Sequence, residues 1–398
     1  MNTTGLMAFA AATMAALVST AADYYVDNVN GDDAGAGTTR QTALKSLKAA
    51  TARLKPGDTL HLLPQGVFSE MLAFNGPASG GTPDKPIVVK GHGATLTGLK
   101  PVVDDGWVDK GDGLWLSPNK CRWGACVPHA YLPDRKRVTV ATSDAAYRDP
   151  AKLQPGEGAW NGDGLYFRVE AGKHPQDYRL SGAYQINGVE INGGASYIVV
   201  EDLIAEYVAN DGVNVHGPCR GLVFRNIEGR WCGDEGFSVH EDVQANVYNG
   251  YFHHNDDGIC DICASQTLFF GCRVEKNDRW GVGFHGGMRV LCDSVVRDNG
   301  GVQIYAQPGR IGKSYGFDQS NPMLACRMYM KNVRVEGGEG PALRVNKGAE
   351  VVADQCTFSG TDVGVDVRGG VLHLNRSEVR DVRGERVVKT ADGVVVEK

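Results

Sequence analysis

Aromatic side chains are scarce in this chain, at 8% of its 398 residues, although 42% of the residues are hydrophobic. A large core of this composition must be built mainly from Val, Ile, Leu, Ala and Gly. Positive charge is not in excess either, and the formal net charge of −6 argues against nucleic acid as a partner. After an apolar run at residues 6–18, no stretch is long and apolar enough for a membrane span.

The apolar run itself predicts export. It is followed by the small residues Ser19, Thr20, Ala21 and Ala22, a pattern typical of a secretory signal peptide, although residues 1–5 contain no Lys or Arg. The run is shorter than the roughly 18 residues that a spanning helix needs. We therefore expect residues 1–22 to be a signal peptide and the protein to be secreted or periplasmic.

A glycine recurs in the middle of the chain at spacings of 24, 22, 23 and 20 residues, each time before a short apolar strand. These glycines are Gly212, Gly236, Gly258, Gly281 and Gly301. The period is that of a β-solenoid coil. Coils of this kind stack, so that equivalent residues form columns about 4.8 Å apart.

The ten cysteines would suit an oxidising compartment. Cys121 and Cys126 flank an irregular segment and are the pair most expected to form a disulfide. Cys272 and Cys292 each precede a repeating glycine by nine residues. We therefore expect these two to stack in one interior column as free thiols.

The pattern divides the chain into four parts. Residues 1–22 are the signal peptide, 23–101 an N-terminal cap with the first coils, 102–180 an insert rich in Trp and Asp, and 181–398 the coils that carry the site. Residues 43–50 predict a short amphipathic helix, within residues 41–54, that covers the open end of the solenoid. A second insert is expected at about residues 306–323.

The segments TALKSLKAATARLKPGDTLHLLPQGVFSE and SGGTPDKPIVVKGHG resemble the opening of bacterial β-helix proteins of the pectate-lyase-like superfamily. That superfamily holds polysaccharide lyases, glycoside hydrolases and epimerases. The resemblance implies an all-β, right-handed parallel β-helix with a short N-terminal capping helix and a strand-rich insert. It also implies a carbohydrate polymer or oligosaccharide as substrate, and we expect a monomer.

Acidic residues gather beside the repeating glycine on three successive coils. They are Asp211, then Asp234 and Glu235, then Asp256 and Asp257. Two adjacent coils that each present paired carboxylates place four acids within roughly 10 Å, and their repulsion raises some of their pKa values. A fold tolerates that cost where it binds a cation or performs acid/base chemistry.

The same columns resemble the site of polygalacturonase-type glycoside hydrolases. The matching segments are Gly233-Asp234-Glu235-Gly236, Asn255-Asp256-Asp257-Gly258 and Phe284-His285-Gly286. By this resemblance Asp256 is the general acid, Glu235 and Asp257 activate water, and His285 tunes the acid. The Arg-Ile-Lys motif of that family has no intact counterpart, which argues against a galacturonate substrate.

Other residues near these columns are candidates for contact with substrate. His216, His240 and His285 each follow their glycine by four residues, but Ile262 interrupts the column, which therefore suits a hydrogen-bonding or sugar-contacting row better than a metal site. Trp280 continues the acidic column and is either buried or a platform for a sugar ring. The expected substrate-binding residues are Asp234, His240, Lys276, Arg279 and Trp280.

Two other kinds of function remain open. A polysaccharide lyase would use calcium and a basic residue, and Lys276, the only lysine between Lys173 and Lys313, lies with Arg279 one coil from the acids. A carbohydrate-binding solenoid without catalysis would explain the fold but not the paired acids. The sequence favours the hydrolase, which needs no metal or other cofactor, with calcium reserved for the lyase.

Overall fold

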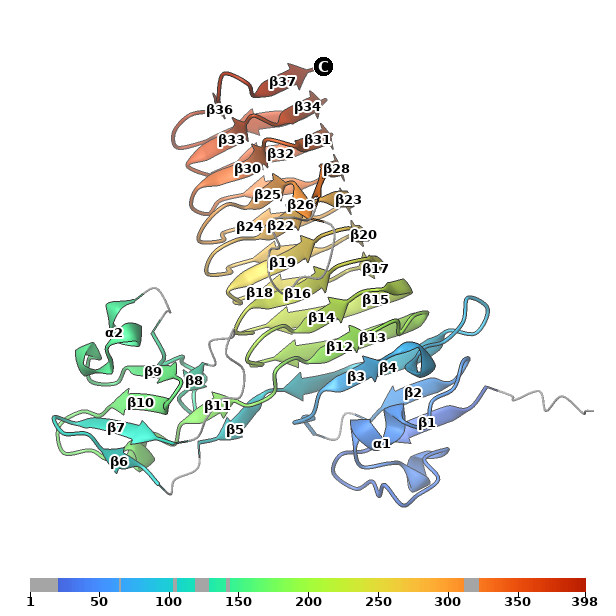
Figure 1. The fold of residues 1–398 in the computed structure, drawn as a ribbon, viewed down its shortest axis with the longest axis vertical. Helices are drawn as coiled ribbons and strands as arrows, with labels where there is room; N and C mark the ends of the chain where they lie inside the picture. The colour runs from blue at the N-terminus through green and yellow to red at the C-terminus, as the bar shows by residue number, and fades with distance from the viewer. Residues whose placement is uncertain (1–20, 64–65, 103–105, 119–128, 141–143, 311–321) are drawn as a thin grey trace, which may run out of the picture.

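Short parallel strands that recur once per coil build the chain into a solenoid (Figure 1). The computed structural model describes residues 21–63, 66–102, 106–118, 129–140, 144–310 and 322–398. The predicted signal peptide, apart from its last two residues, and the Cys121–Cys126 pair lie outside these ranges. No helix among the described residues is long and apolar enough to cross a membrane.

One face of the solenoid is a ten-stranded parallel sheet, which carries the acidic columns. Its strands are β3 (Leu72–Asn75), β12 (Val189–Asn192), β14 (Val213–His216), β16 (Glu235–His240), β19 (Asp257–Ile262), β22 (Val282–His285), β25 (Ile304–Gln307), β30 (Pro341–Asn346), β33 (Val363–Arg368) and β36 (Val387–Lys389).

The remaining faces belong to one 18-stranded sheet, which wraps around the coils because long strands such as β15 pair with two strands of the next coil. Its strands are β1 (Asp23–Val26), β2 (Thr59–Leu62), β4 (Ile87–Thr97), β13 (Ile198–Glu206), β15 (Cys219–Arg230), β17 (Val243–Tyr248), β18 (Tyr251–His253), β20 (Gln266–Phe270), β21 (Arg273–Glu275), β23 (Gly287–Cys292), β24 (Val295–Arg297), β28 (Cys326–Lys331), β29 (Arg334–Glu336), β31 (Ala349–Asp354), β32 (Thr357–Ser359), β34 (Val371–Asn375), β35 (Glu378–Arg380) and β37 (Val394–Glu397).

The repeating glycine marks the place where consecutive coils approach most closely. Gly212, Gly236, Gly258 and Gly281 lie opposite one another on consecutive coils, as predicted. A Cβ added to Gly212 would lie 2.6 Å from the carbonyl oxygen of Gly236, and one on Gly236 would lie 3.0 Å from that of Gly258. Only glycine fits this column without a shift of the backbone.

Two columns predicted from spacing are wrong. Gln303, not Gly301, lies opposite Gly281, because the strand pairing places Val282 opposite Ile304. Cys292 lies opposite Phe270, whereas Cys272 is bonded through its backbone to Ser294 on the next coil. Both errors have one cause: the positions were counted from Gly301, which does not lie in the glycine column. The cysteines that the structure describes are all free and buried.

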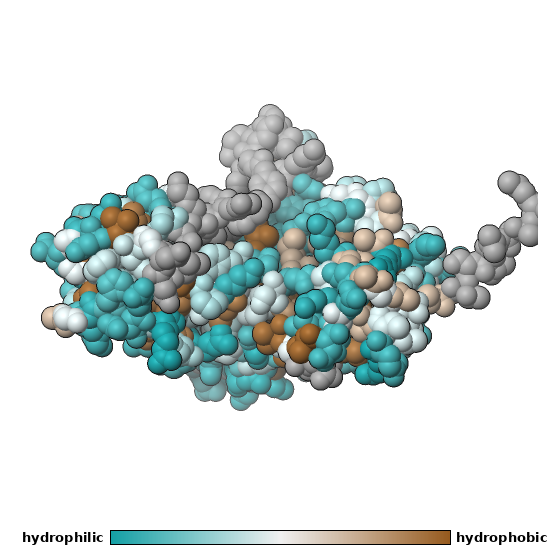
Figure 2. All heavy atoms as spheres, turned by 90° about the horizontal axis from the view of Figure 1, so that it is seen from below, coloured by the Kyte–Doolittle hydropathy of each residue, from teal (hydrophilic) through white to brown (hydrophobic). Residues whose placement is uncertain are grey.

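Helix α1 (Leu47–Thr51) lies at the N-terminal end, inside the predicted range. The Ser46 side chain accepts a hydrogen bond from the Ala49 amide and caps the helix, which buries Leu47 and Ala50. The helix begins later than predicted because Leu44 forms a parallel bridge with Val26 of the first strand. Seen from this end, the surface is mainly hydrophilic with scattered hydrophobic residues (Figure 2).

The insert projects beside the first coils (Figure 1). Its main sheet has four antiparallel strands, β6 (Val108–Asp109), β7 (Leu114–Ser117), β10 (Gly164–Arg168) and β9 (Gly158–Asn161). A three-stranded sheet of β5 (Leu99–Pro101), β11 (Ser181–Ala183) and β8 (Ala130–Tyr131) joins it to the solenoid. Helix α2 (Ala145–Arg148) also belongs to it, and the hairpin β26 (Gly309–Arg310) and β27 (Met323–Leu324) follows β25.

Candidate active site on three neighbouring coils

The acidic residues that the sequence singled out come together where strands β16 and β19 begin. Glu235 lies opposite Asp257 in the strand pairing, and the Glu235 amide donates to Asp211 Oδ1 at 3.1 Å. One carboxylate oxygen from each of Asp234, Asp256 and Asp257 lies within 4.8 Å of the others. Asp211, Asp234 and Glu235 form a second such group. The cluster therefore spans three coils.

The cluster has an inner and an outer layer. Asp257 and Asp211 are each 1% exposed and Glu235 is 8% exposed, so these three form the inner layer. The side chains of Asp234 and Asp256 remain about one-third exposed, at 35% and 34%. Only this outer pair can meet a large substrate directly.

Arg279 is the cation that holds the cluster together. Its Nε lies 3.0 Å from Asp256 Oδ2, and its Nη2 lies 2.6 Å from Asp257 Oδ2 and 4.0 Å from Asp234 Oδ1. The next amide, that of Trp280, donates to Asp257 Oδ1 at 2.8 Å. Arg279 was expected to contact substrate, but in the structure its guanidinium group contacts carboxylates.

The pKa of each acid in the cluster is raised, as predicted for some of them, but the main cause is burial rather than the predicted repulsion between the acids. The pKa of Asp234 rises to about 9 through burial and then through the charges of Glu235, Asp257 and Asp256. For Asp256 burial raises the pKa to about 6, with Arg279 opposing the rise. The cluster therefore offers both a protonated and an ionised carboxyl near neutral pH.

The pKa values of the inner acids are raised as well. Burial brings that of Asp211 to about 7 and lifts that of Glu235 well above its ordinary range, with the Asp211 charge as its next cause. For Asp257 burial outweighs the opposing effect of Arg279. A protonated Glu235 beside Asp211 can share one proton with it, which stabilises two adjacent carboxyls in a dry environment.

The asparagine of the Asn255-Asp256-Asp257 motif has a structural role. Asn255, Asn277 and Asn299 are buried. The backbone N–H of Asn255 donates to Asn277 Oδ1, and that of Asn277 donates to Asn299 Oδ1, each at 3.0 Å. The Asn299 amide donates to Gln303 Oε1, also at 3.0 Å. This ladder fixes the turn that positions Asp256 and Asp257. The sequence carried its signal, three asparagines at intervals of 22 residues, but it was not recognised.

Aromatic rings continue the site toward the C-terminal coils. Trp280 is half-buried, and its ring centroid lies 5.4 Å from that of Tyr305 and 6.1 Å from that of His285. His285 belongs to strand β22, and burial lowers its pKa to about 4, so that its imidazole is neutral. Tyr305 was not among the residues predicted from sequence.

Lys276 and His240 lie at different edges of this region. Lys276 is an exposed corner residue with a left-handed backbone (φ 54°), and its carbonyl accepts the His254 amide. No ion pair joins it to an acid of the cluster within the described chain. His240 stacks on His216 with 4.4 Å between ring centroids, and its Nε2 lies 2.8 Å from Ser238 Oγ.

The insert contacts the solenoid beside the acids. Arg137 Nη1 lies 2.8 Å from Asp278 Oδ2, the residue before Arg279, and the Tyr131 hydroxyl donates to the Trp231 carbonyl at 3.4 Å. Residues of the insert and of the solenoid together line a cavity of about 170 Å³, among them Arg137, Trp231 and Asp278. Sequence reasoning missed Arg137, because nothing in its neighbourhood marks it as facing a coil 141 residues away.

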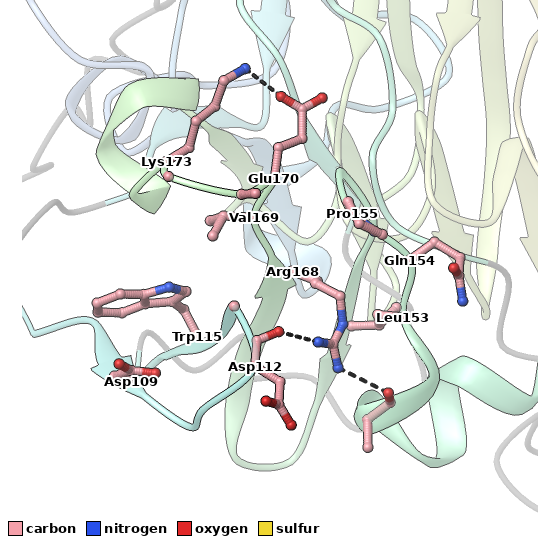
Figure 3. Close-up of a pocket in the computed structure, with 14 residues that line it drawn as sticks. Asp109, Asp112, Trp115, Leu153, Gln154, Pro155, Arg168, Val169, Glu170 and Lys173 are labelled. Atoms are coloured by element: carbon pink, nitrogen blue, oxygen red, sulfur yellow. Dashed lines mark hydrogen bonds and ion pairs between the residues drawn. The ribbon is translucent and has the colours of Figure 1, made fainter.

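A separate, open groove of about 890 Å³ lies on the insert (Figure 3). Trp115, Asp109, Glu170 and Lys173 line it, and Arg168 crosses it to donate to the carbonyl of Ala151 at 2.9 Å. None of the residues predicted as catalytic or substrate-binding lies in this groove. The acidic cluster lies on the solenoid instead.

A family model described as right handed beta helix region matches residues 187–379, the coils that carry the acidic cluster. The fold is a right-handed parallel β-helix. Similar solved structures include a glycoside hydrolase (12% identity, TM-score 0.47, covering 95% of this chain and 96% of that one). Others are pectate lyase Pel9A (14%, 0.47, 94% and 78%) and XylC in complex with xylose (12%, 0.46, 85% and 69%). No curated protein sequence matches the chain.

Proposed function

We propose that this β-helix protein is a secreted or periplasmic glycoside hydrolase that cleaves a polysaccharide or oligosaccharide with the outer carboxyls of its acidic cluster. The observation that carries the proposal is the pairing of Asp234 and Asp256. Both are about one-third exposed, on neighbouring coils, and their pKa values are raised to about 9 and about 6. Glycoside hydrolysis needs one protonated and one ionised carboxyl on either side of the scissile bond.

The pKa order assigns the two roles. Asp234, protonated at neutral pH, donates its proton to the glycosidic oxygen as the bond to the anomeric carbon breaks. Asp256, ionised and held by Arg279, is the second carboxylate. This differs from the resemblance to polygalacturonases, which gives Asp256 the acid role. Glu235 and Asp257 then support the outer pair from the inner layer, because their carboxyls are too buried to meet a sugar ring.

We propose retention of configuration as the outcome. One oxygen of Asp234 and one of Asp256 lie within 4.8 Å of each other, so the two carboxyls are close enough for the roughly 5–5.5 Å separation of a retaining enzyme. Asp256 would then bond to the anomeric carbon while the leaving sugar departs with the proton of Asp234. A water molecule, losing its proton to Asp234, would release the second sugar and regenerate both carboxyls.

A polysaccharide lyase is the second candidate, because the oxygens of Asp234, Asp256 and Asp257 are grouped closely enough to bind one calcium ion. Two features weigh against it. The guanidinium group of Arg279 already neutralises these carboxylates, and its ion pairs leave it poorly placed as a free base. Lys276 lies at an exposed corner rather than in the cluster.

The experiment is an assay of newly formed reducing ends on a panel of polysaccharides, with the full-length protein and its Asp234→Asn and Asp256→Asn variants. We expect each variant to lose activity by roughly 10²–10⁴-fold. Asp298→Asn, at an exposed corner of a nearby coil, is the matched control and should be unchanged. Undiminished turnover by Asp256→Asn, or no reducing ends from any glycan, would refute the proposal.

A further inference from the structure

The 18-stranded sheet has one face in the core and one face in solvent. In β17, β20 and β28 buried residues alternate with more exposed ones, so every second side chain points out of the solenoid. Figure 1 shows these strands on the side of the solenoid away from the insert. We call the outward surface of β4, β13, β15, β17, β20, β23, β28 and β31 the long face. The acidic cluster is not part of it.

One column of outward residues on the long face is almost entirely apolar. Tyr329 in this column is 38% exposed, and Met288 beside it is 56% exposed. Monomeric proteins seldom expose a continuous apolar patch of more than a few hundred Å², and a larger one is typical of a surface that another molecule covers. With Asn246 at its centre, the column contains Val199, Val223, Leu268, Val290, Tyr329 and Val352, which lie opposite one another from coil to coil.

A shallow groove of about 410 Å³ lies in the middle of the long face. Residues of β15, β17, β20 and β23 line it, and those that the structure describes are all uncharged. Its polar side chains are the amides of Gln244, Asn246 and Gln266. An amide both donates and accepts, so amides of this kind can pair with copies of themselves. The groove therefore suits an uncharged partner surface with amides of its own.

The neighbouring outward column is aromatic in the middle and charged at both ends. Tyr248 and Phe270 stack at its centre with 5.4 Å between ring centroids. On each side, one residue separates this aromatic pair from two charged residues. The charged residues are Lys90 and then Glu201 toward the N-terminus, and Lys331 and then Asp354 toward the C-terminus. Positions at the same distance from the centre therefore carry opposite charges.

We infer that the long face is the interface of a homodimer, with a two-fold axis that runs along the strands between β17 and β20. A two-fold interface uses the same patch on both subunits, so the patch must be complementary to itself. This axis places Tyr248 over the partner's Phe270, and Glu201 over the partner's Lys331. It also places apolar residues of one subunit over apolar residues of the other, such as Val223 over the partner's Val290.

Other positions of the axis would bring like charges together. An axis through β20 would place Glu201 over the partner's Asp354, and an axis through β17 would place Lys90 over the partner's Lys331. Like charges that face each other across an interface disfavour that pairing. Charge order along the column thus selects the axis between β17 and β20, and with it the second copy of the chain as the partner.

The long face is large enough for a specific dimer. Eight strands at about 4.8 Å spacing and about six residues long give a face of roughly 34 by 20 Å, or about 1,400 Å² over both partners. Specific interfaces bury about 1,200–2,000 Å². The inference replaces the expectation of a monomer and does not rest on the proposed function, because the dimer leaves both acidic clusters uncovered.

Sedimentation velocity of the protein at roughly 1–500 μM tests the association. We expect monomer and dimer in equilibrium, with a dissociation constant of roughly 1–100 μM. Tyr329→Lys, at an exposed position of the apolar column, should weaken the dimer by roughly 10-fold or more. Val29→Lys, a matched change at a 54% exposed residue in an N-terminal turn, should leave it unchanged.

A mixing experiment tests the axis and does not depend on Tyr329→Lys folding. Glu201→Lys and Lys331→Glu each place like charges together twice per dimer, so each variant alone should associate roughly 10-fold more weakly than the wild type. Mixed with each other, they should form a heterodimer about as tight as the wild type, because both charge pairs are then opposite. Unchanged melting temperatures confirm that each variant is folded.

Three results would overturn the inference. The first is a protein that stays monomeric over the whole concentration range. The second is a dimer that neither Tyr329→Lys nor the charge variants weaken, because the subunits would then associate through another surface. The third is a pair of weakened charge variants that do not bind each other more tightly than themselves, because residues 201 and 331 would then not face each other across a two-fold axis.

Discussion

Arg279 Nη2 lies 2.6 Å from Asp257 Oδ2, and the same guanidinium group reaches Asp256 Oδ2 with its Nε at 3.0 Å. One half-exposed cation thus neutralises acids of both layers. Without it, the buried carboxylates would repel one another with little solvent to screen them. The ion pairs of Arg279 explain how the fold keeps five acids close together. They also link the pKa of Asp256 to Arg279, which can be replaced without changing Asp256 itself.

Replacing Arg279 by Met should shift the pH profile of activity. Arg279 opposes the rise in the pKa of Asp256, so its removal raises that pKa further, and Asp256 would ionise only at higher pH. The acidic limb of kcat/KM should therefore move upward by roughly 1–2 pH units. Arg297→Met, which removes an arginine paired with Glu275 on a neighbouring coil, is the control. An acidic limb that stays in place in Arg279→Met would contradict the role given to Arg279.

The pH dependence of stability should report the buried acids. Asp211 has its pKa raised from 3.8 to about 7 by burial, so between these values the folded state binds more protons than the unfolded state. The contribution of Asp211 to the free energy of unfolding is therefore most favourable below about pH 4 and is lost as the pH rises toward about 7. Asp211→Asn should flatten this decline in urea unfolding curves. Equal slopes for the two proteins would show that Asp211 titrates normally.

Much of the arrangement could be predicted from sequence, because contact between equivalent residues on successive coils is itself periodic. The column of Gly212, Gly236, Gly258 and Gly281 follows from a clash that recurs at each coil, and it placed the acids together correctly. The column failed at Gly301, where Gln303 takes the equivalent position and ends the asparagine ladder through its side-chain amide. The spacing of glycines alone cannot show whether a glycine or Gln303 occupies this position of the column.

The layering of the acids could not be predicted in the same way. Glu235 and Asp234 are adjacent in sequence, but one is buried and the other about one-third exposed, because the direction of each side chain depends on the neighbouring coil. Arg137 reaches the site from the insert, at a sequence distance that no local pattern encodes. Periodicity identifies which coil a residue belongs to, and packing decides what it faces.

A buried ion pair gives a test of the interior of the solenoid. Asp261 and Arg289 are both 0% exposed, with Oδ2 and Nε 2.8 Å apart, and Phe284 lies beside both. Asp261→Asn or Arg289→Met alone should lower the free energy of unfolding by roughly 3–5 kcal/mol, because either leaves a buried group uncompensated. The double variant Asp261→Leu, Arg289→Met should recover most of that loss.

The control for this pair is Arg334→Met, which breaks an exposed ion pair with Glu336 and should cost less than about 1 kcal/mol. Chemical denaturation of the four variants and the wild type supplies all the values. Single variants as stable as the wild type would show that the pair is not buried as the structure has it.

Retention of configuration is a separate prediction from the close approach of Asp234 and Asp256. Proton NMR of the first turnover products should show the anomer of the substrate linkage before mutarotation mixes the two forms. An inverted first product would mean that a water molecule lies between the carboxyls during the reaction, and that the acids separate when substrate binds.

The chemistry of the new chain ends tests the central claim most directly. Hydrolysis adds one water to each pair of products and leaves saturated sugars, whereas elimination leaves an unsaturated uronate that absorbs in the ultraviolet. We expect products that carry the mass of one added water and show no ultraviolet absorbance, with formation abolished in Asp256→Asn. Unsaturated products from a uronate polymer, dependent on calcium, would contradict the account.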